Sequence, residues 1–154
     1  MAEFSISCPD FEEGGEIPKK FGYKFENKAP FIQFDNIPQV AFDYTNSTES
    51  IALIMDDPDA MAAVGKVWVH YLFYQSTDIR GLSDFEPVYG KTDFGEIGYG
   101  GPAPPDKRHT YVFKAYALNK KLDLKEGYSK QELEDAMKGH IIAEAKLTGT
   151  YAPD

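Results

Sequence analysis

The stretch HTYVFKAYA, residues 109–117, is the clearest starting point for the fold. Side chains of a β-strand point alternately to opposite faces of a sheet, so every second residue shares a face. The residues that share the first face are His109, Tyr111, Phe113 and Ala115. The other face carries Thr110, Val112, Lys114 and Tyr116. This alternation predicts a long strand with a histidine at its start.

Two apolar runs come earlier in the chain. Residues 51–55 read IALIM and end abruptly in the turn sequence Asp56-Asp57-Pro58-Asp59. Residues 67–74 are apolar on both faces, which is typical of a central strand that is covered on each side.

Shorter strands are predicted around Phe4, Ile6 and Cys8, which alternate with polar residues, and at residues 31–34 and 40–42. The 13 glycines and 10 prolines provide many turns. With 154 residues, we expect one mainly-β domain spanning residues 1–154.

One helix is predicted near the C-terminus. Ser129 and Glu132 have the spacing of a capping box. The residues that follow at helical spacing are Leu133, Ala136, Met137, His140, Ile141 and the polar Glu144. Gly149 is a plausible stop signal, and Gly139 inside the predicted helix suggests close packing there. His140 is assigned to the packing of this helix.

Charge and composition exclude several classes of function. The net charge is −9, and the basic residues are scattered, which argues against binding to nucleic acids or to anionic membranes. Cys8 is the only cysteine, so an intrachain disulfide is impossible and a cysteine-ligated metal is not expected. The start of the chain lacks the pattern of a signal peptide, and no apolar run is long enough to cross a bilayer, so we expect a cytoplasmic protein.

Candidate functional residues lie at the ends of the strong strands. His70 follows Trp68 on the same strand face, and His109 opens the later strand. Taken singly, each histidine is readily explained as a core residue bonded to a carbonyl. Asp57 and Asp59 flank Pro58, and such carboxylates either serve as local acceptors in a turn or orient a neighbouring imidazole.

The segment 87–107, PVYGKTDFGEIGYGGPAPPDK, has no credible helix or strand of any length, and we interpret it as an ordered functional loop. Successive backbone N–H groups in its glycine-rich part can form an anion-binding nest. It is not a P-loop, because Phe85 stands where the first glycine is required.

These motifs, taken in order, resemble those of the phosphatidylethanolamine-binding protein family, also called the Raf kinase inhibitor-like family. The matching elements are DPDA at residues 57–60, WVH at 68–70, GYGGPAPP at 98–105 and HTY at 109–111. The likeness covers nearly the whole chain and is greatest for the short bacterial and archaeal branch. It implies a β-sandwich-like fold around a large central sheet, with a C-terminal helix and a small surface cavity that binds phosphate or phosphoethanolamine-like anions.

The resemblance also implies a set of ligand-binding residues. They are Asp57, Asp59, Trp68, His70, Gly100, Gly101, Pro102, His109 and Tyr111. The sequence departs from the usual family pattern at Met61, Ala103 and Thr110, which stand for a proline, a cysteine and an arginine. None of these changes removes a pocket donor, but Met61 and Thr110 weaken any inference about a particular partner surface.

The expected function is therefore binding rather than catalysis, with no catalytic residues, metal or other cofactor. The ligand would be a phosphate-containing small molecule or a phosphorylated group, and the family suggests regulation of a partner enzyme such as a kinase. Inhibition of a serine protease is one alternative. Another is a hydrolase or metalloenzyme that uses the two histidines and an aspartate. Because an anion is attracted to imidazolium, we expect binding to weaken as pH rises through the histidine range.

Overall fold

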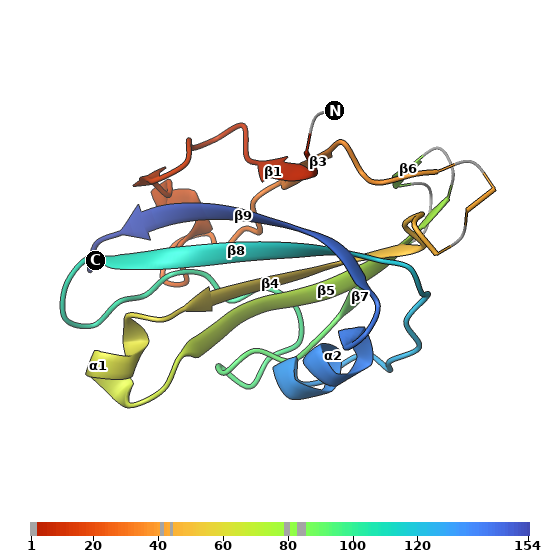
Figure 1. The fold of residues 1–154 in the computed structure, drawn as a ribbon. Helices are drawn as coiled ribbons and strands as arrows, with labels where there is room; N and C mark the ends of the chain where they lie inside the picture. Colours follow the sequence, from red (N-terminus) through yellow and green to blue (C-terminus); the bar gives the residue numbers. More distant parts are fainter. Residues whose placement is uncertain (1–2, 41, 44, 79–80, 83–85) are drawn as a thin grey trace.

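In the computed structural model, a long twisted sheet forms the centre of the molecule (Figure 1). The structure describes residues 3–40, 42–43, 45–78, 81–82 and 86–154. The strands are β1 Ser5–Ser7, β2 Gly15–Glu16, β3 Gln33–Asp35, β4 Ser50–Asp57, β5 Trp68–Asp78, β6 Gly81–Leu82, β7 Val88–Tyr89, β8 His109–Leu118 and β9 Ile141–Tyr151. The helices are a short 3-10 helix at Lys19–Phe21, α1 at Ala60–Val64 and α2 at Lys130–Met137.

The seven strands of the main sheet follow the order β2-β9-β8-β4-β5-β6, with β7 also paired to β5. The strand β4 is central and antiparallel to both neighbours, β5 and β8. β4 has every residue buried, and β8 alternates buried and half-buried residues over most of its length. The three strong strands predicted from the sequence, and the mainly-β fold class, are therefore confirmed.

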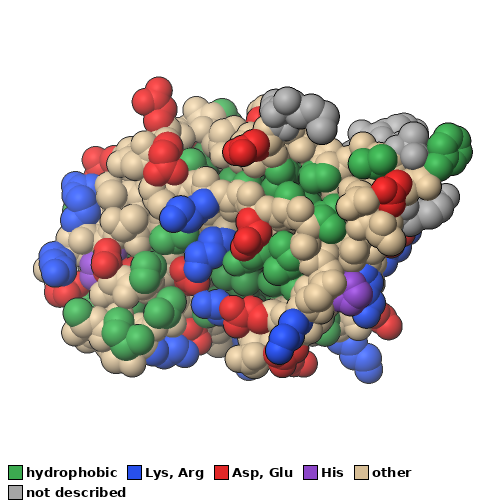
Figure 2. Space-filling view, in the orientation of Figure 1, with side chains coloured by type: hydrophobic (Ala, Val, Ile, Leu, Met, Phe, Trp, Pro, Cys, Tyr) green, Lys and Arg blue, Asp and Glu red, His purple; other side chains and the backbone are tan. Residues whose placement is uncertain are grey.

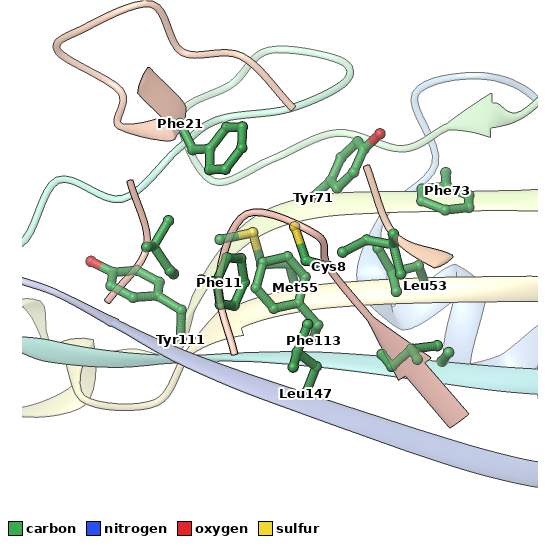
Figure 3. Close-up of a cluster of buried hydrophobic side chains, with 14 of the residues drawn as sticks. Cys8, Phe11, Phe21, Leu53, Met55, Tyr71, Phe73, Tyr111, Phe113 and Leu147 are labelled. Carbon is green, nitrogen blue, oxygen red and sulfur yellow. The ribbon is translucent and has the colours of Figure 1, made fainter. Parts of the chain in front are cut away.

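Apolar clusters cover both faces of this sheet. One face packs against the N-terminal segment, which contains the small β1–β3 sheet, and its core includes Phe11, Met55 and Phe113 (Figure 3). The other face packs against α2 through Leu133 and Met137. Alternation in β1 is confirmed as well, since Phe4, Ile6 and Cys8 are all buried. This two-sided packing fixes the sheet rigidly enough to position residues at its ends.

The C-terminal helix is shorter than predicted. α2 begins at the expected capping box but ends at Met137, and the residues from Ile141 onward form β9, paired with β8 from His109 to Leu118. The apolar residues of this segment fit period two as well as helical spacing. The long partner strand decides between them, because only strand pairing satisfies the backbone of both β8 and β9.

The glycines and histidine assigned to that helix have other roles. Gly139 has a positive φ of 83° just after α2, and a Cβ there would meet nothing within 4 Å, so close packing is not its reason. Gly149 lies inside β9, where a Cβ would be 2.6 Å from Ile17 Cγ1. His140 lies between α2 and β9, and its Nδ1 is 3.1 Å from Asn119 Oδ1, so its assignment to helix packing was wrong.

Two short strands were also misplaced. The strand predicted at 31–34 lies at Gln33–Asp35, and Phe31 is exposed. Of the strand predicted at 40–42, Ala41 lies outside the described residues, while Val40 and Phe42 belong to no strand. Within the predicted loop 87–107 only β7 and two isolated bridges are regular. Among the described helices, none is long and apolar enough to cross a membrane.

Candidate functional site

A pocket of about 130 Å³ opens at the end of the main sheet beside α1. It lies where β4 ends and where β5 and β8 begin, at the end of the sheet next to α1 in Figure 1. The residues that line it are Asp57, Ala60, Ala63, Val64, Trp68, His70, Phe94, Ala103, Pro104, Pro105, His109 and Tyr111. Five of the nine predicted site residues are therefore brought to one cavity: Asp57, Trp68, His70, His109 and Tyr111.

Strand register explains why these distant segments meet. β4 runs antiparallel to β5 and β8, so its last residues lie beside the first residues of both neighbours. Asp57 is paired with Trp68, and Asp56 is paired with Val112 on the opposite side. The rings of His70 and Tyr111 consequently approach each other edge to face, with 5.1 Å between their centroids.

His109 is held between two carboxylates. Its Nδ1 lies 2.6 Å from Asp57 Oδ2 and its Nε2 lies 2.7 Å from Asp106 Oδ1. Burial by itself would lower the pKa of His109, but the hydrogen bonds to Asp57 and Asp106 outweigh it and raise that pKa above its ordinary value. An ionised carboxylate can only accept, so a carboxylate on each ring nitrogen favours the doubly protonated imidazolium form of His109.

His70 has the opposite state. Its Nδ1 lies 2.6 Å from the carbonyl oxygen of Gly100, and a carbonyl can only accept, so this nitrogen carries the proton. Burial lowers the pKa of His70, despite the raising effect of the Gly100 hydrogen bond. His70 is therefore neutral, and its Nε2 presents a lone pair.

Three buried polar atoms of the pocket have no hydrogen-bond partner among the described residues. They are Asp57 Oδ1, Trp68 Nε1 and the Tyr111 hydroxyl. Most buried polar groups in folded proteins are paired, so each exception calls for an explanation. Figure 3 shows the Tyr111 ring at one end of the apolar core, with its hydroxyl pointing away from the other labelled side chains. Burial, followed by the nearby Asp57 charge, raises the pKa of Tyr111, so its hydroxyl remains a donor at neutral pH.

The glycine loop supports the pocket and does not line it. The amide of Gly100 donates to the His70 carbonyl (2.8 Å), and that of Gly101 donates to Asn27 Oδ1 (2.7 Å). Both N–H groups are therefore already used inside the protein. Glycine is needed at position 101 because a Cβ would lie 2.0 Å from the carbonyl oxygen of Phe21.

The other predicted site residues also lie behind the pocket wall. Pro102 is buried, and its carbonyl accepts from the Tyr23 amide at 3.0 Å. Asp59 is exposed and accepts from the Thr110 amide at 2.8 Å, which anchors the start of β8 beside the end of β4. Asp59 and Pro102 thus support the wall, and the three residues that follow Pro102 line the cavity.

Sequence reasoning missed two residues of the site. Asp106 is hydrogen-bonded to Nε2 of His109. The ring centroid of Phe94 lies 5.6 Å from that of Trp68 and 5.5 Å from that of His70. Asp106 lies three residues before His109, a spacing that could have suggested a local ion pair. Phe94 had no such signal, because its position depends on the path of the loop and on stacking against Tyr23.

The described residues contain no group of three or more His, Cys, Asp or Glu side chains placed to hold a metal ion. The pocket offers two imidazoles, one carboxylate, an indole N–H and a phenol. The Trp68 indole N–H and the Tyr111 hydroxyl are unpartnered donors in this set, and an oxyanion accepts hydrogen bonds from groups of this kind.

The fold and the pocket together define a class of protein: a β-sandwich-like domain with a small polar cavity at one end of its central sheet. The chain belongs to the phosphatidylethanolamine-binding protein family, whose sequence model matches residues 7–152. It is 39% identical over 151 residues to a UPF0098 protein of Methanothermobacter thermautotrophicus, covering 92% of this chain and 93% of that one. A UPF0098 protein of Chlamydia muridarum is also 39% identical, over 97% of this chain and 99% of its own.

Two crystal structures show the same fold. The phosphatidylethanolamine-binding protein homolog CT736 from Chlamydia trachomatis superposes with a TM-score of 0.85 at 34% identity, covering all of both chains. YbcL from Escherichia coli, described as a member of the mammalian family, gives a TM-score of 0.80 at 26% identity over 99% of this chain and 100% of its own. The family resemblance predicted from the sequence is confirmed.

Proposed function

We propose that the protein binds small phosphate-like oxyanions in this pocket. The observation that carries the proposal is the gathering of unpartnered buried polar atoms around a buried imidazolium. Two of these atoms, Trp68 Nε1 and the Tyr111 hydroxyl, are donors. A protein with a net charge of −9 attracts no anion at long range, so local donors must supply the affinity.

The two histidines contribute in different ways. His109 is the positively charged ring, but both of its N–H groups are bonded to carboxylates. It can give an anion a charge-assisted hydrogen bond, roughly twice as strong as a neutral one, only after one carboxylate leaves. Neutral His70 presents a lone pair at Nε2, so it accepts a hydrogen bond from a protonated anion oxygen, or it takes up a proton when a fully ionised anion enters. Asp57 is repulsive to an anion, but its charge is already compensated by His109.

Binding is favoured over catalysis by the composition of the pocket. The lining residues include no Ser, Thr, Cys or Lys, so the pocket has none of the usual hydroxyl, thiol or amine nucleophiles. His109 carries a carboxylate on each ring nitrogen, so only the Nε2 lone pair of His70 could act as a general base. That base has no serine, threonine or cysteine in the pocket lining to activate, whereas binding of an anion needs no such nucleophile.

The test is a titration with inorganic phosphate followed by the fluorescence of Trp68, the only tryptophan in the chain. We expect saturable binding to the wild type and at least a tenfold weaker affinity, about 1.4 kcal/mol or more, for His70→Ala and for His109→Ala. His140→Ala is the matched control, because this third histidine lies outside the pocket. Equal affinity in all four proteins would rule out the site.

The pH dependence of anion affinity is a second test. Inorganic sulfate is the better probe here, because it stays a dianion throughout the histidine range. We expect its affinity to fall between about pH 5.5 and 8.5, as His70 and then His109 lose the protons that stabilise the bound charge. A flat profile would show that binding is not linked to the imidazoles.

We further propose that anion binding serves the regulation of a partner enzyme. Met61 and Val64 of α1 are 54% and 51% exposed, and Val64 also lines the pocket. Hydrophobic side chains are visible over α1 in Figure 2. This apolar rim would let a protein cover the cavity while its phosphorylated group enters. Titration against a protein kinase and against chymotrypsin-like and subtilisin-like proteases tests this role, and no inhibition at micromolar concentration would discard it.

A further inference from the structure

Asp106 occupies Nε2 of His109, and a charged imidazolium N–H is the strongest donor that the pocket could offer an anion. Both ring nitrogens of His109 are occupied in the ligand-free protein, one by Asp57 and the other by Asp106. His109 lines the pocket, but its side chain has no exposed surface. An anion can therefore use this imidazolium only if one of the two carboxylates leaves.

The two carboxylates differ in how readily they can leave. The Asp57 side chain is 4% exposed at the end of a central strand, so its departure would bury an unpaired charge. The Asp106 side chain is 41% exposed and lies in an irregular loop. None of residues 103–107 makes a backbone–backbone hydrogen bond with another described residue. Rotation of Asp106 into water thus gives up its bond to His109 and its local contacts with the backbone of residues 106 and 107, which water can replace.

We propose that Asp106 is an internal competitor for the anion, occupying Nε2 of His109 until a ligand displaces it. The inference rests on the proposed function, since it names the residue that limits anion affinity at that same site. Asp106 is a positioning and specificity residue in this sense. It does not line the cavity, and it acts by withholding a donor from the ligand.

The competition also makes the pocket selective. Asp106 is tethered only three residues from His109, so its effective concentration at Nε2 far exceeds that of a free carboxylate in solution. A simple carboxylate such as acetate offers His109 nothing that Asp106 does not already supply. Phosphate carries more oxygens, so it can bond His109 and still offer acceptors to the unpartnered Trp68 and Tyr111 donors. Asp106 therefore disfavours carboxylates more than phosphates.

The test compares Asp106→Ala with the wild type in titrations with inorganic phosphate and with acetate at pH 6. Asp123→Ala is the matched control, because it removes one exposed negative charge in the loop before α2. We expect Asp106→Ala to bind phosphate about tenfold more tightly and to gain more than this for acetate. Asp106→Asn should fall between Asp106→Ala and the wild type, and Asp123→Ala should match the wild type.

A ligand-free measurement separates this inference from the proposed function. In ¹⁵N NMR, the pKa of His109 should fall in Asp106→Ala and stay unchanged in Asp123→Ala. An unchanged His109 pKa, or unchanged phosphate affinity in Asp106→Ala with a wild type that binds phosphate, overturns the role of Asp106 and leaves the proposed function standing. If neither protein binds phosphate, the proposed function and the competitor role both fail.

Discussion

The two histidines of the pocket both have almost no exposed surface, and they carry different charges. His70 and His109 are 2% and 1% exposed, so solvent access does not distinguish them. Their partners do: His70 donates to the carbonyl of Gly100, and His109 lies between the carboxylates of Asp57 and Asp106. Burial favours a neutral ring in both cases, and only the pair of carboxylates is strong enough to reverse it.

This difference divides the pocket into two sides. The β4–β8 side holds a compensated ion pair, with Asp57 and His109 fixed by adjacent central strands. The β5 side is neutral and depends on the glycine loop. The Gly100 amide donates to the His70 carbonyl, and the Gly100 carbonyl accepts from the His70 ring. The β4–β8 side thus provides the charged ring of His109. The β5 side provides the Nε2 lone pair of His70, which can take up a proton when an anion binds.

The largest expected effect comes from the charged side. Asp57→Ala should lower the free energy of unfolding by about 3 kcal/mol at pH 6, because it removes the buried partner of an imidazolium. Urea denaturation followed by Trp68 fluorescence measures it. Asp59→Ala, in the same turn, removes only an exposed side chain bonded to the Thr110 amide and should cost about 1 kcal/mol. Equal losses in the two variants would show that the His109 ion pair contributes no special stability.

The next prediction separates the two rings by pH. ¹⁵N NMR should show His109 titrating above, and His70 below, the ordinary histidine pKa of about 6.5. The raised pKa of His109 stabilises the fold fully below about pH 6.5, and this contribution is lost as pH rises through its folded pKa. The lowered pKa of His70 acts in reverse: its contribution is present above about pH 6.5 and is lost as pH falls through its folded pKa.

Stability measurements check these signs. Each pKa unit between the folded and unfolded states corresponds to about 1.4 kcal/mol. In urea denaturation at a series of pH values, the free energy of unfolding of the wild type should fall as pH rises through the folded pKa of His109. This fall should be absent in His109→Gln. The fall in unfolding free energy as pH drops through the folded pKa of His70 should be absent in His70→Gln. The same pH slope in both variants would mean that the rings do not differ as their partners indicate.

The charged side was easier to predict from sequence than the neutral side. Asp57 ends a strand that the apolar run 51–55 predicts, and His109 begins a strand whose period of two is clear. Antiparallel pairing of neighbouring strands brings such ends together. Asp106 lay in an irregular segment, where no periodicity indicates the direction of a side chain. The family resemblance named Gly100 and Gly101, but it did not show that their amides are already used by His70 and Asn27.

The C-terminal segment shows the same limit in the fold. Residues 141–151 contain apolar residues at spacings that suit both a helix and a strand, and the sequence alone favoured continuation of the helix. The choice is made by β8, which offers a long row of backbone partners on that side of the sheet. Such tertiary pairing overrides local pattern, and Gly139, at φ 83°, is the residue that allows the chain to change course.

The smallest expected effect tests the neutral side through Asn27. Its Oδ1 accepts from the Gly101 amide at 2.7 Å, and its own φ is 51°. Asn27→Gly removes the acceptor and keeps the backbone conformation accessible, so it should cost about 1 kcal/mol of unfolding free energy. Because Gly100 lies next in the chain, the ring resonances of His70 should shift, while those of His109 should not.

Asn36→Gly is the matched control for this variant. Asn36 also has a positive φ, 58°, and its side chain bonds the exposed backbone of Glu3, away from the pocket. It should leave both histidines unchanged. If Asn27→Gly moved the His109 resonances as much as those of His70, the pocket would respond as one coupled unit. The neutral ring and the charged ring would then be parts of a single hydrogen-bond network, and the glycine loop would help to set the charge of His109.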